Sequence, residues 1–373
     1  MDFSLTPEQE SFRQSIRQFA ESSVAPIASD LDRKAQCPAD VIDSLAGLGL
    51  LGCDRDFVSY VAGLVEVSRV WASLGAILSV HHSFVCYPIA RFGTEAQKNK
   101  YLKLLVNERQ LGCYAFAEPA AGSDAGSIQT TAMADGDVFV LNGQKLFVTN
   151  GRQARVAIVY ALTDVSKGRE GLSAFIVDMN TPGLTIGAAA EKLGLRAAEI
   201  VELSFRDCRV PKANLLGTVN QGFAIARHVV ESGRIDIAAQ AVGIAEACLD
   251  ASVDHAKERR QFGRPIAEFE AIQWMLADMG TEIDASKLLM YRAASLRARR
   301  PDDNRLTMVA AQAKLFASET ANRAAYHAIQ VFGGHGYLAA YPVERYFRDA
   351  RAMTLYEETS EIERLVIEHE LAK

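Results

Sequence analysis

The sequence predicts a three-part α+β protein: an all-α N-terminal domain, a middle β-barrel or β-sandwich domain, and a C-terminal four-helix bundle. Three observations support this order. Apolar residues recur at helical spacing in the first third, short strand-like runs begin at Leu111, and long helical stretches return from Gly222. A chain of 373 residues is long enough for two or three domains. We place them at residues 1–112, 113–217 and 218–373.

Helix-start signals mark the N-terminal domain. Thr6-Pro7-Glu8-Gln9 is a capping box with proline at the first helical position, and Thr94-Glu95-Ala96-Gln97 is a second capping box. Pro38 opens another helix. Apolar periodicity predicts further helices over about residues 58–70 and 74–90.

Strand-like runs separated by turn residues fill the middle domain. The runs are residues 138–141, 146–149, 154–161, 174–177 and 201–205. Turns are expected at Asp135-Gly136, Asn150-Gly151 and Pro182-Gly183. Asn142-Gly143 is a hairpin signal, so a hairpin is also expected there.

The last domain reads as long helices with short connections, which is typical of a bundle. Candidates are residues 223–257, 268–297, 307–332 and 342–348, leading into a final helix from Glu361 to about Leu371.

The composition argues against several classes of function. The net charge is −6, and the chain has no basic run, so nucleic acid is not an expected partner. We expect no membrane span, and the N-terminus from Met1 lacks the basic start and apolar run of a signal peptide. The six cysteines and seven histidines show no metal-ligand spacing, so we expect no metal site and a reducing, cytoplasmic location.

One stretch near the C-terminus has the features of a built site. It includes Tyr356-Glu357-Glu358-Thr359-Ser360-Glu361 and follows the cluster Gly333-Gly334-His335-Gly336. Thr359 or Ser360 is expected to cap the final helix, whose free N–H groups suit an anion, with Glu357 just outside in the loop. The alternative is an ordinary helix cap with solvated glutamates.

Three other stretches suit a flat or phosphate-bearing ligand. The small residues of 118–126 allow close approach to the backbone, or form a generic turn. Residues 146–150 place an aromatic and a hydroxyl at a strand end. The segment from Arg259 to Pro265 offers arginines to a phosphate, or forms a solvated basic hinge.

Taken together, these stretches resemble the acyl-CoA dehydrogenase family, most of all its short-chain, butyryl-CoA-type members. The resemblance covers essentially the whole length in the same α–β–α order. The matching segments are residues 116–126, 141–145, 147–150, 192–196, 209–217, 259–265, 330–337 and 348–362.

The resemblance implies FAD bound between the β domain and the C-terminal bundle of a homo-oligomer, a dimer or tetramer. The flavin ring would be lined by Tyr114, Phe116, Ala117, Gly122, Ser123, Phe147, Val148, Thr149, Thr359 and Glu361. The pyrophosphate and adenosine end of FAD on a neighbouring subunit would be held by Arg259, Phe262, Glu270, Gln330, Val331, Gly333 and Gly334.

Glu357 matches the catalytic base of the family. It would take a proton from the carbon α to a thioester while hydride leaves the β carbon, and burial is expected to raise its pKa. Gly233 stands where some members carry the base instead, which strengthens the case for Glu357. The substrate would be faced by Ser123, Glu231, Arg234, Tyr356 and Glu358.

Four departures from the family pattern concern the substrate arm and acyl pocket more than the chemistry. Glu358 replaces the usual glycine after the base, where the thioester arm passes. Glu270 replaces a glutamine near FAD. Ala117 replaces a Ser or Thr, and Ala120 replaces a Gly. An acidic loop after Cys53 is missing.

The implied function is FAD-dependent α,β-dehydrogenation of an acyl thioester in fatty acid metabolism. A short-chain acyl-CoA is the expected substrate. An electron-transfer flavoprotein or a similar acceptor would take the electrons. One alternative is a dehydrogenase of specialised metabolism whose thioester sits on an acyl carrier protein. Another is a catalytically silent homologue acting as a structural or binding subunit.

Overall fold

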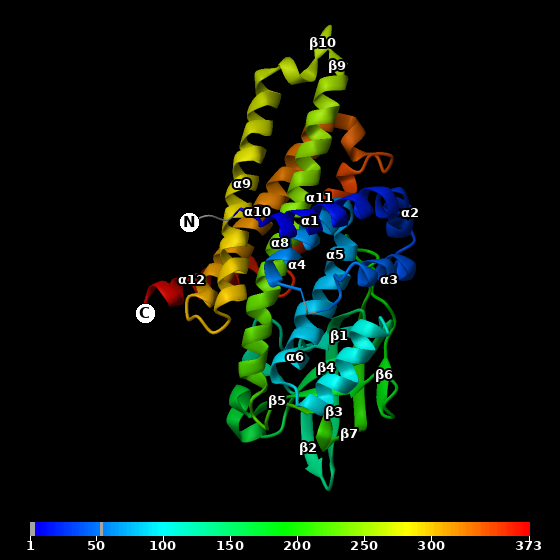
Figure 1. Ribbon diagram of the computed structural model, residues 1–373, viewed down its shortest axis with the longest axis vertical. Helices are drawn as coiled ribbons and strands as arrows, with labels where there is room; N and C mark the ends of the chain where they lie inside the picture. Colours follow the sequence, from blue (N-terminus) through cyan, green and yellow to red (C-terminus); the bar gives the residue numbers. More distant parts are fainter. Residues whose placement is uncertain (1–3, 53–54) are drawn as a thin grey trace.

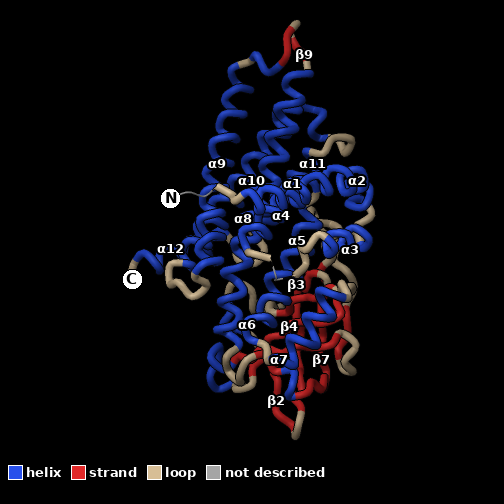
Figure 2. Tube along the Cα trace, viewed as in Figure 1, coloured by secondary structure: helices blue, strands red, loops and turns tan. Residues whose placement is uncertain are grey.

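A computed structural model describes residues 4–52 and 55–373 (Figure 1). Cys53 and Asp54, where the family loop was expected to be missing, and residues 1–3 of the N-terminus lie outside the described residues. Helices occupy one end and the middle of the elongated molecule, and the strands gather at the other end (Figure 2).

The N-terminal third is helical, as predicted. Its elements are α1 (Pro7–Phe19), η1 (Ala20–Val24), α2 (Ala25–Arg33), α3 (Ala39–Gly47), α4 (Phe57–Val70), α5 (Ala72–Ser79), η2 (Val80–Cys86), α6 (Tyr87–Phe92), α7 (Glu95–Gln97) and η3 (Lys98–Asn107). Both capping boxes are present: the hydroxyls of Thr6 and Thr94 accept from the N–H groups of Gln9 and Gln97, whose amides accept in return at 2.9 Å.

One helical stretch, Ala72–Phe92, is long and apolar enough to cross a membrane, which the sequence analysis did not anticipate. Its most apolar window is 94% buried inside the protein. It is therefore explained as a core helix, because a helix that is apolar on every side is also what a large protein interior requires.

The middle domain is one eight-stranded sheet in the order β6-β7-β3-β2-β4-β5-β8, with β1 paired to β4. The bounds are β1 (Leu111–Ala115), η4 (Ala125–Ser127), β2 (Thr131–Asp135), β3 (Val138–Thr149), β4 (Ala154–Leu162), η5 (Val165–Gly171), β5 (Leu172–Asp178), β6 (Leu184–Ile186), β7 (Ile200–Pro211), η6 (Lys212–Asn214) and β8 (Leu215–Leu216).

The continuous apolar run of β4 is explained by burial on both faces of the sheet. Val156, Ile158 and Tyr160 pack toward the N-terminal helices, whereas Ala157 and Val159 belong to a core on the opposite face. Alternate residues of a strand point to opposite faces, so both sets must be apolar.

The hairpin expected at Asn142-Gly143 is wrong. β3 runs through these residues, and the chain reverses at Asp135-Gly136 instead, where Gly136 has φ +56°. Asn142 uses its side chain across the sheet, because its Oδ1 accepts from the N–H of Asp207 at 2.8 Å. Gly143 marks a register shift against β7, and a Cβ there would lie 2.4 Å from Oγ1 of Thr130.

The C-terminal part contains the long helices. They are α8 (Gly222–Glu258), α9 (Glu270–Arg299), α10 (Leu306–Phe332), α11 (Val343–Met353) and α12 (Ser360–Leu371), with the short elements β9 (Arg260–Gln261), β10 (Arg264–Pro265), η7 (Ile266–Glu268) and η8 (Gly333–Tyr337). In Figure 1, α8 and α9 rise together to the β9–β10 hairpin, at the opposite end from the sheet domain.

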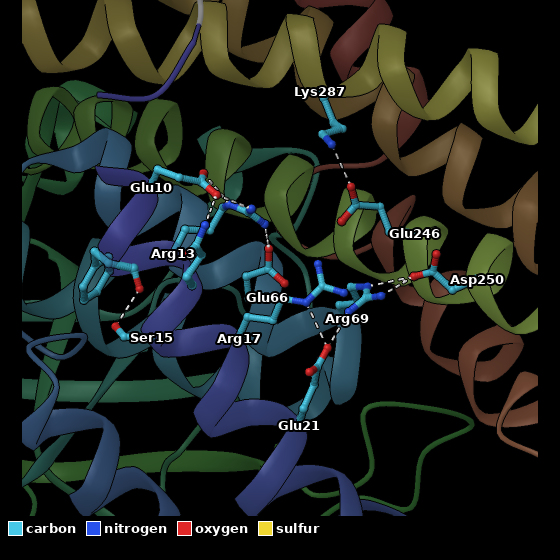
Figure 3. A network of polar contacts seen from close by, with 12 residues as sticks. Glu10, Arg13, Ser15, Arg17, Glu21, Glu66, Arg69, Glu246, Asp250 and Lys287 are labelled. Carbon is cyan, nitrogen blue, oxygen red and sulfur yellow. Dashed lines mark hydrogen bonds and ion pairs between the residues drawn. The ribbon is translucent and has the colours of Figure 1, made fainter. Parts of the chain in front are cut away.

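A network of ion pairs ties the N-terminal helices to α8, and α8 to α9 (Figure 3). Arg13 on α1 bonds the buried Glu66 of α4, and Arg69 of α4 reaches Asp250 of α8 with an Nε–Oδ2 distance of 2.9 Å. These contacts fix α4 against α8, so that they position the face of α8 on which the candidate site is built.

Candidate active site

The loop between α11 and α12 carries the site, and its backbone is firmly held. Thr359 caps α12 by accepting from the N–H of Ile362, which confirms the predicted cap. The hydroxyl of Tyr356 donates to Oε1 of Gln240 on α8 at 2.6 Å. Between these two anchors Glu357 has φ +65°, a strained backbone for a non-glycine residue, and such strain gathers at functional sites.

A buried ion cluster lies directly beside Glu357. Arg234 of α8 is 3% exposed and bonds the carboxylates of Glu358, at 2.9 Å from Nε, and Glu363, at 3.0 Å. Lys314 of α10, also buried, donates to the backbone carbonyl of Glu358. The Glu358 carboxylate is therefore held by Arg234. Whether its side chain also crowds a thioester arm stays a prediction.

Burial shifts the pKa of the carboxyl groups of Glu357 and Glu363 upward. Glu357 is half-buried by surface area, but protein atoms surround its carboxyl closely, and this burial raises its pKa to about 8. The negative charge of Glu358 adds to the rise, and Lys314 opposes it. Burial likewise raises the pKa of Glu363, which is 0% exposed, to about 7. A carboxyl with such a pKa exchanges a proton near neutral pH.

Aromatic side chains of the sheet domain meet this loop. Tyr114 on β1 lies parallel to Phe116 with ring centroids 6.1 Å apart, and edge-on to Phe84 at 5.1 Å. Burial raises the pKa of the Tyr114 phenol well above its usual value, and the charges of Glu357 and Glu358 contribute. Tyr114 is thus close enough to the loop for the charges of Glu357 and Glu358 to act on its phenol, and its role at a flavin stays a prediction.

Phe147 and its neighbours form a distinct rim at the end of β3. Phe147 has φ +55° at an irregularity between Lys145 and Val148, and its side chain is 70% exposed. Val148 is turned into the sheet core, which leaves only its backbone for a ligand, and Thr149 is half-buried. An exposed aromatic ring on a strained backbone is a surface that fits a flat ligand.

Hydrogen bonds and an ion pair of Glu118 hold the loop over residues 117–128 against the sheet domain. Glu118 pairs with the fully buried Lys145 at 2.7 Å and accepts the N–H groups of Gln129 at 2.6 Å and Thr130 at 3.1 Å. Above this anchor Gly122 and Ser123 are exposed, and a Cβ at Gly122 would meet nothing within 4 Å. The loop leaves room for a ligand to approach its backbone.

A second group of predicted residues gathers at the far tip of the helices. Arg259 ends α8 and Phe262, 94% exposed with φ +54°, forms the β9–β10 turn. Val331 is buried against Ala256 and Ile266, so that it joins the end of α10 to this hairpin. Exposed residues of the same region are Glu270, Gln330, Gly333 and Gly334.

The tip and the Glu357 loop lie apart in one chain, since the hairpin stands at one end of α8 and α9 and Tyr114 belongs to the sheet at the other (Figure 1). That the tip serves a neighbouring subunit stays a prediction. Glu231, expected at the substrate, is buried and accepts from the hydroxyl of Thr307 at 2.5 Å, whereas Glu361 is exposed on the first turn of α12.

Sequence reasoning missed four polar residues of the site: Lys314, Glu363, Asp236 and Gln240. A usable signal existed for Lys314 and Asp236, because each is a charged residue within an apolar helical run. Such a residue is rarely buried without a specific partner.

The residues fit the flat cofactor that the resemblance implies. Phe147 and Tyr114 offer aromatic surface. The backbone is open at Gly122 and at Gly333 and Gly334 of the tip, because a Cβ added at any of these glycines would have no atom within 4 Å. The arrangement combines a carboxyl group of raised pKa with exposed aromatic surface and open backbone, which are features that suit an oxidoreductase with a flat cofactor.

Comparison with known proteins gives the family. Family models match in all three parts: the acyl-CoA dehydrogenase N-terminal domain over residues 6–109, the middle domain over 113–208 and the C-terminal domain over 220–372. The chain is 45% identical over 366 residues to the mitochondrial short-chain specific acyl-CoA dehydrogenase of Mus musculus, covering 95% of this chain and 88% of that one.

Solved structures agree. The butyryl-CoA dehydrogenase of Megasphaera elsdenii superposes with a TM-score of 0.97 at 40% identity over 100% of both chains. The prolyl acyl carrier protein oxidase AnaB gives a TM-score of 0.95 at 34% identity, over 99% of this chain and 100% of that one. The chain belongs to the acyl-CoA dehydrogenase family, whose members are FAD-binding oxidoreductases acting on CH–CH bonds.

Proposed function

We propose that the protein catalyses α,β-dehydrogenation of a short-chain acyl-CoA, with Glu357 as the base. The observation that carries the proposal is the held, strained position of Glu357, its raised pKa of about 8, and Tyr114 beside it. The short-chain preference follows the relatives, since similar proteins are named short-chain specific and butyryl-CoA dehydrogenases.

In the proposed reaction the chain's own residues position and move a proton. The Glu357 carboxylate takes the proton from the α carbon, and its raised pKa makes it a stronger base than an ordinary glutamate. Thr359, Tyr356 and Lys314 hold the loop so that this carboxylate stays in place. FAD, when bound, supplies the acceptor for the hydride that leaves the β carbon.

We assign the two residue groups to two ends of FAD in an assembled dimer or tetramer. The group around Tyr114, Phe147 and Thr359 suits the flavin ring, and the tip with Arg259 and Gly333 suits the pyrophosphate and adenosine. An electron-transfer flavoprotein is the proposed acceptor, supported by a solved structure of that title from Acidaminococcus fermentans, with a TM-score of 0.97 at 41% identity.

A second candidate is an acyl chain delivered on an acyl carrier protein. Glu358 favours it, because a side chain in the place of the usual glycine narrows the path of the arm, and any charge not balanced by Arg234 repels CoA, with its several phosphates, more than the single phosphodiester of a carrier-protein arm. The similarity to a prolyl acyl carrier protein oxidase supports the same candidate.

The test is a panel of thioesters added to the purified FAD-loaded protein, with bleaching of the flavin absorbance as the readout. Butyryl-CoA, hexanoyl-CoA and butyryl groups on an acyl carrier protein form the panel. We expect butyryl-CoA to bleach fastest. Bleaching by the carrier-protein thioester alone would support the second candidate. A protein that takes up no FAD and binds no thioester would be a silent subunit.

A further inference from the structure

A buried carboxylate lies on the same face of α8 as the Glu357 loop. Asp236 is 0% exposed and stands four residues before Gln240, so the two side chains share one face of the helix. Gln240 accepts the hydroxyl of Tyr356, the residue next to Glu357. The charge of Asp236 is also felt at Glu357, where it contributes to the raised pKa. Asp236 therefore lies close to the Glu357 loop.

The surroundings of Asp236 are polar within an otherwise apolar interface. The Tyr60 hydroxyl of α4 donates to Oδ2 at 3.2 Å, and the Tyr60 ring stacks on His82 of η2 at 3.6 Å. The charges of His82 and Arg297 and the hydroxyls of Ser83 and Ser79 also act on this carboxylate, from η2, α9 and α5. The rest of the contact between α4 and α8 is made by residues such as Val61, Leu64, Ile237 and Ala241.

One oxygen of this carboxylate is left over. Within the described part of the chain, Oδ1 of Asp236 has no hydrogen bond of good geometry, although the hydroxyls of Ser79 and Ser83 lie close to the carboxylate. Burying an acceptor without a hydrogen bond costs free energy of folding. An apolar residue at this position would pack more favourably against an alkyl acyl chain. Packing alone does not account for a carboxylate at this point, close to the Glu357 loop.

We propose that Asp236 is a specificity residue that selects an acyl group carrying a hydrogen-bond donor, a hydroxyl or an ammonium, at or beyond its β carbon. Oδ1 accepts this donor while Oδ2 keeps the bond from Tyr60. The substrate is then short and polar rather than a plain alkyl thioester. This inference rests on the proposed function, because it takes an acyl thioester with its α carbon at Glu357.

The first experiment uses the wild-type FAD-loaded protein and two pairs of thioesters of equal size. β-Alanyl-CoA against butyryl-CoA tests the ammonium, and 4-hydroxybutyryl-CoA against pentanoyl-CoA tests the hydroxyl. We expect one donor-bearing ester to exceed its alkyl partner roughly 10- to 100-fold in kcat/KM, the effect of one buried hydrogen bond to a charged group. The rise in Tm given by each ester provides a binding readout that is independent of turnover. Alkyl esters that match or exceed both polar partners would overturn the proposal.

The second experiment changes the residue. Asp236→Asn keeps the size and is expected to reduce the polar-to-alkyl ratio of kcat/KM about 10-fold or more. Asp236→Leu is expected to make the alkyl ester the better substrate. The matched control is Glu66→Gln, which changes another buried carboxylate with an unpaired oxygen, on α4 against Arg13, and leaves the ratio unchanged.

The outcomes separate this inference from the proposed function. If butyryl-CoA bleaches the flavin well and the ratio is unmoved in a folded Asp236→Asn protein, Asp236 is structural and only the inference fails. If none of the four thioesters bleaches the flavin or raises Tm, the proposed function fails and the inference falls with it.

Discussion

Two ion clusters on α8 have opposite electrostatic character. In the cluster of Figure 3, hydrogen bonds from Arg13 lower the pKa of Glu10 to about 2, and those from Arg17 lower the pKa of Glu21. In the cluster at the loop, burial raises the pKa of Glu357 to about 8 and that of Glu363 to about 7. The exposed carboxylates of the first cluster favour the charged form, whereas burial raises the pKa of its buried member Glu66, as it does for Glu357 and Glu363 in the second.

The difference follows from exposure and from the balance of charge. Arg17 and Glu21 are partly in water, and the Figure 3 network spreads its cations among its carboxylates. At the loop, two buried cations, Arg234 and Lys314, face a larger set of carboxylates. The first arrangement holds helices together, and the second keeps a proton acceptor ready.

The largest expected effect comes from removing the base. Glu357→Gln should lower the rate of flavin bleaching by a thioester roughly 10²- to 10⁴-fold, because the other carboxylate of the loop, Glu358, is held in an ion pair by Arg234. Stopped-flow absorbance measures it.

FAD content is the control, and we expect it to be unchanged. Bleaching at the wild-type rate would place the base elsewhere. The cluster at the Glu357 loop would then have no catalytic role that distinguishes it from the cluster of Figure 3.

The sequence predicted much of this picture from local chemistry. The capping boxes at Thr6 and Thr94 and the cap at Thr359 depend on neighbouring residues, so the pattern alone was sufficient. The resemblance supplied Glu357. The false hairpin at Asn142-Gly143 shows the limit, because a register shift against β7, which is distant in sequence, decides the backbone there.

The ion cluster could not be predicted for the same reason. Arg234, Lys314 and Glu363 come from three helices, and only tertiary packing brings them together. Their burial, which sets the pKa values, is likewise a property of the assembled core and not of any segment.

The second prediction concerns stability. Arg234→Met leaves Glu363 buried without its cation and should lower the free energy of unfolding by about 3–5 kcal/mol. Arg17→Met, in the other cluster, should cost only about 0–1 kcal/mol because its pair with Glu21 is exposed. Urea unfolding of both variants measures the contrast.

The pH dependence supplies the check. The carboxyl of Glu363 has a raised pKa, so its contribution to stability is fully present below its ordinary value and is lost as pH rises through about 7. The deficit of Arg234→Met should therefore be larger at pH 8 than at pH 5, and Arg234→Met with Glu363→Gln should recover part of it. Equal losses for Arg234 and Arg17 would show that the two clusters are alike.

The smallest expected effect tests how Glu358 acts on its neighbour. Its negative charge contributes to the raised pKa of Glu357, so Glu358→Gln, which keeps the size, should lower the pH at which kcat/KM rises. The base works ionised: kcat/KM for butyryl-CoA should increase as pH rises, with a midpoint near pH 8 in the wild type and less than about one unit lower in the variant. Glu358→Gly also removes the bulk, and a lower KM for this variant than for Glu358→Gln would show that the side chain crowds the thioester arm. If both variants keep the wild-type midpoint and KM, Glu358 serves only to hold Arg234, and the surplus of carboxylates at the loop does not tune the base.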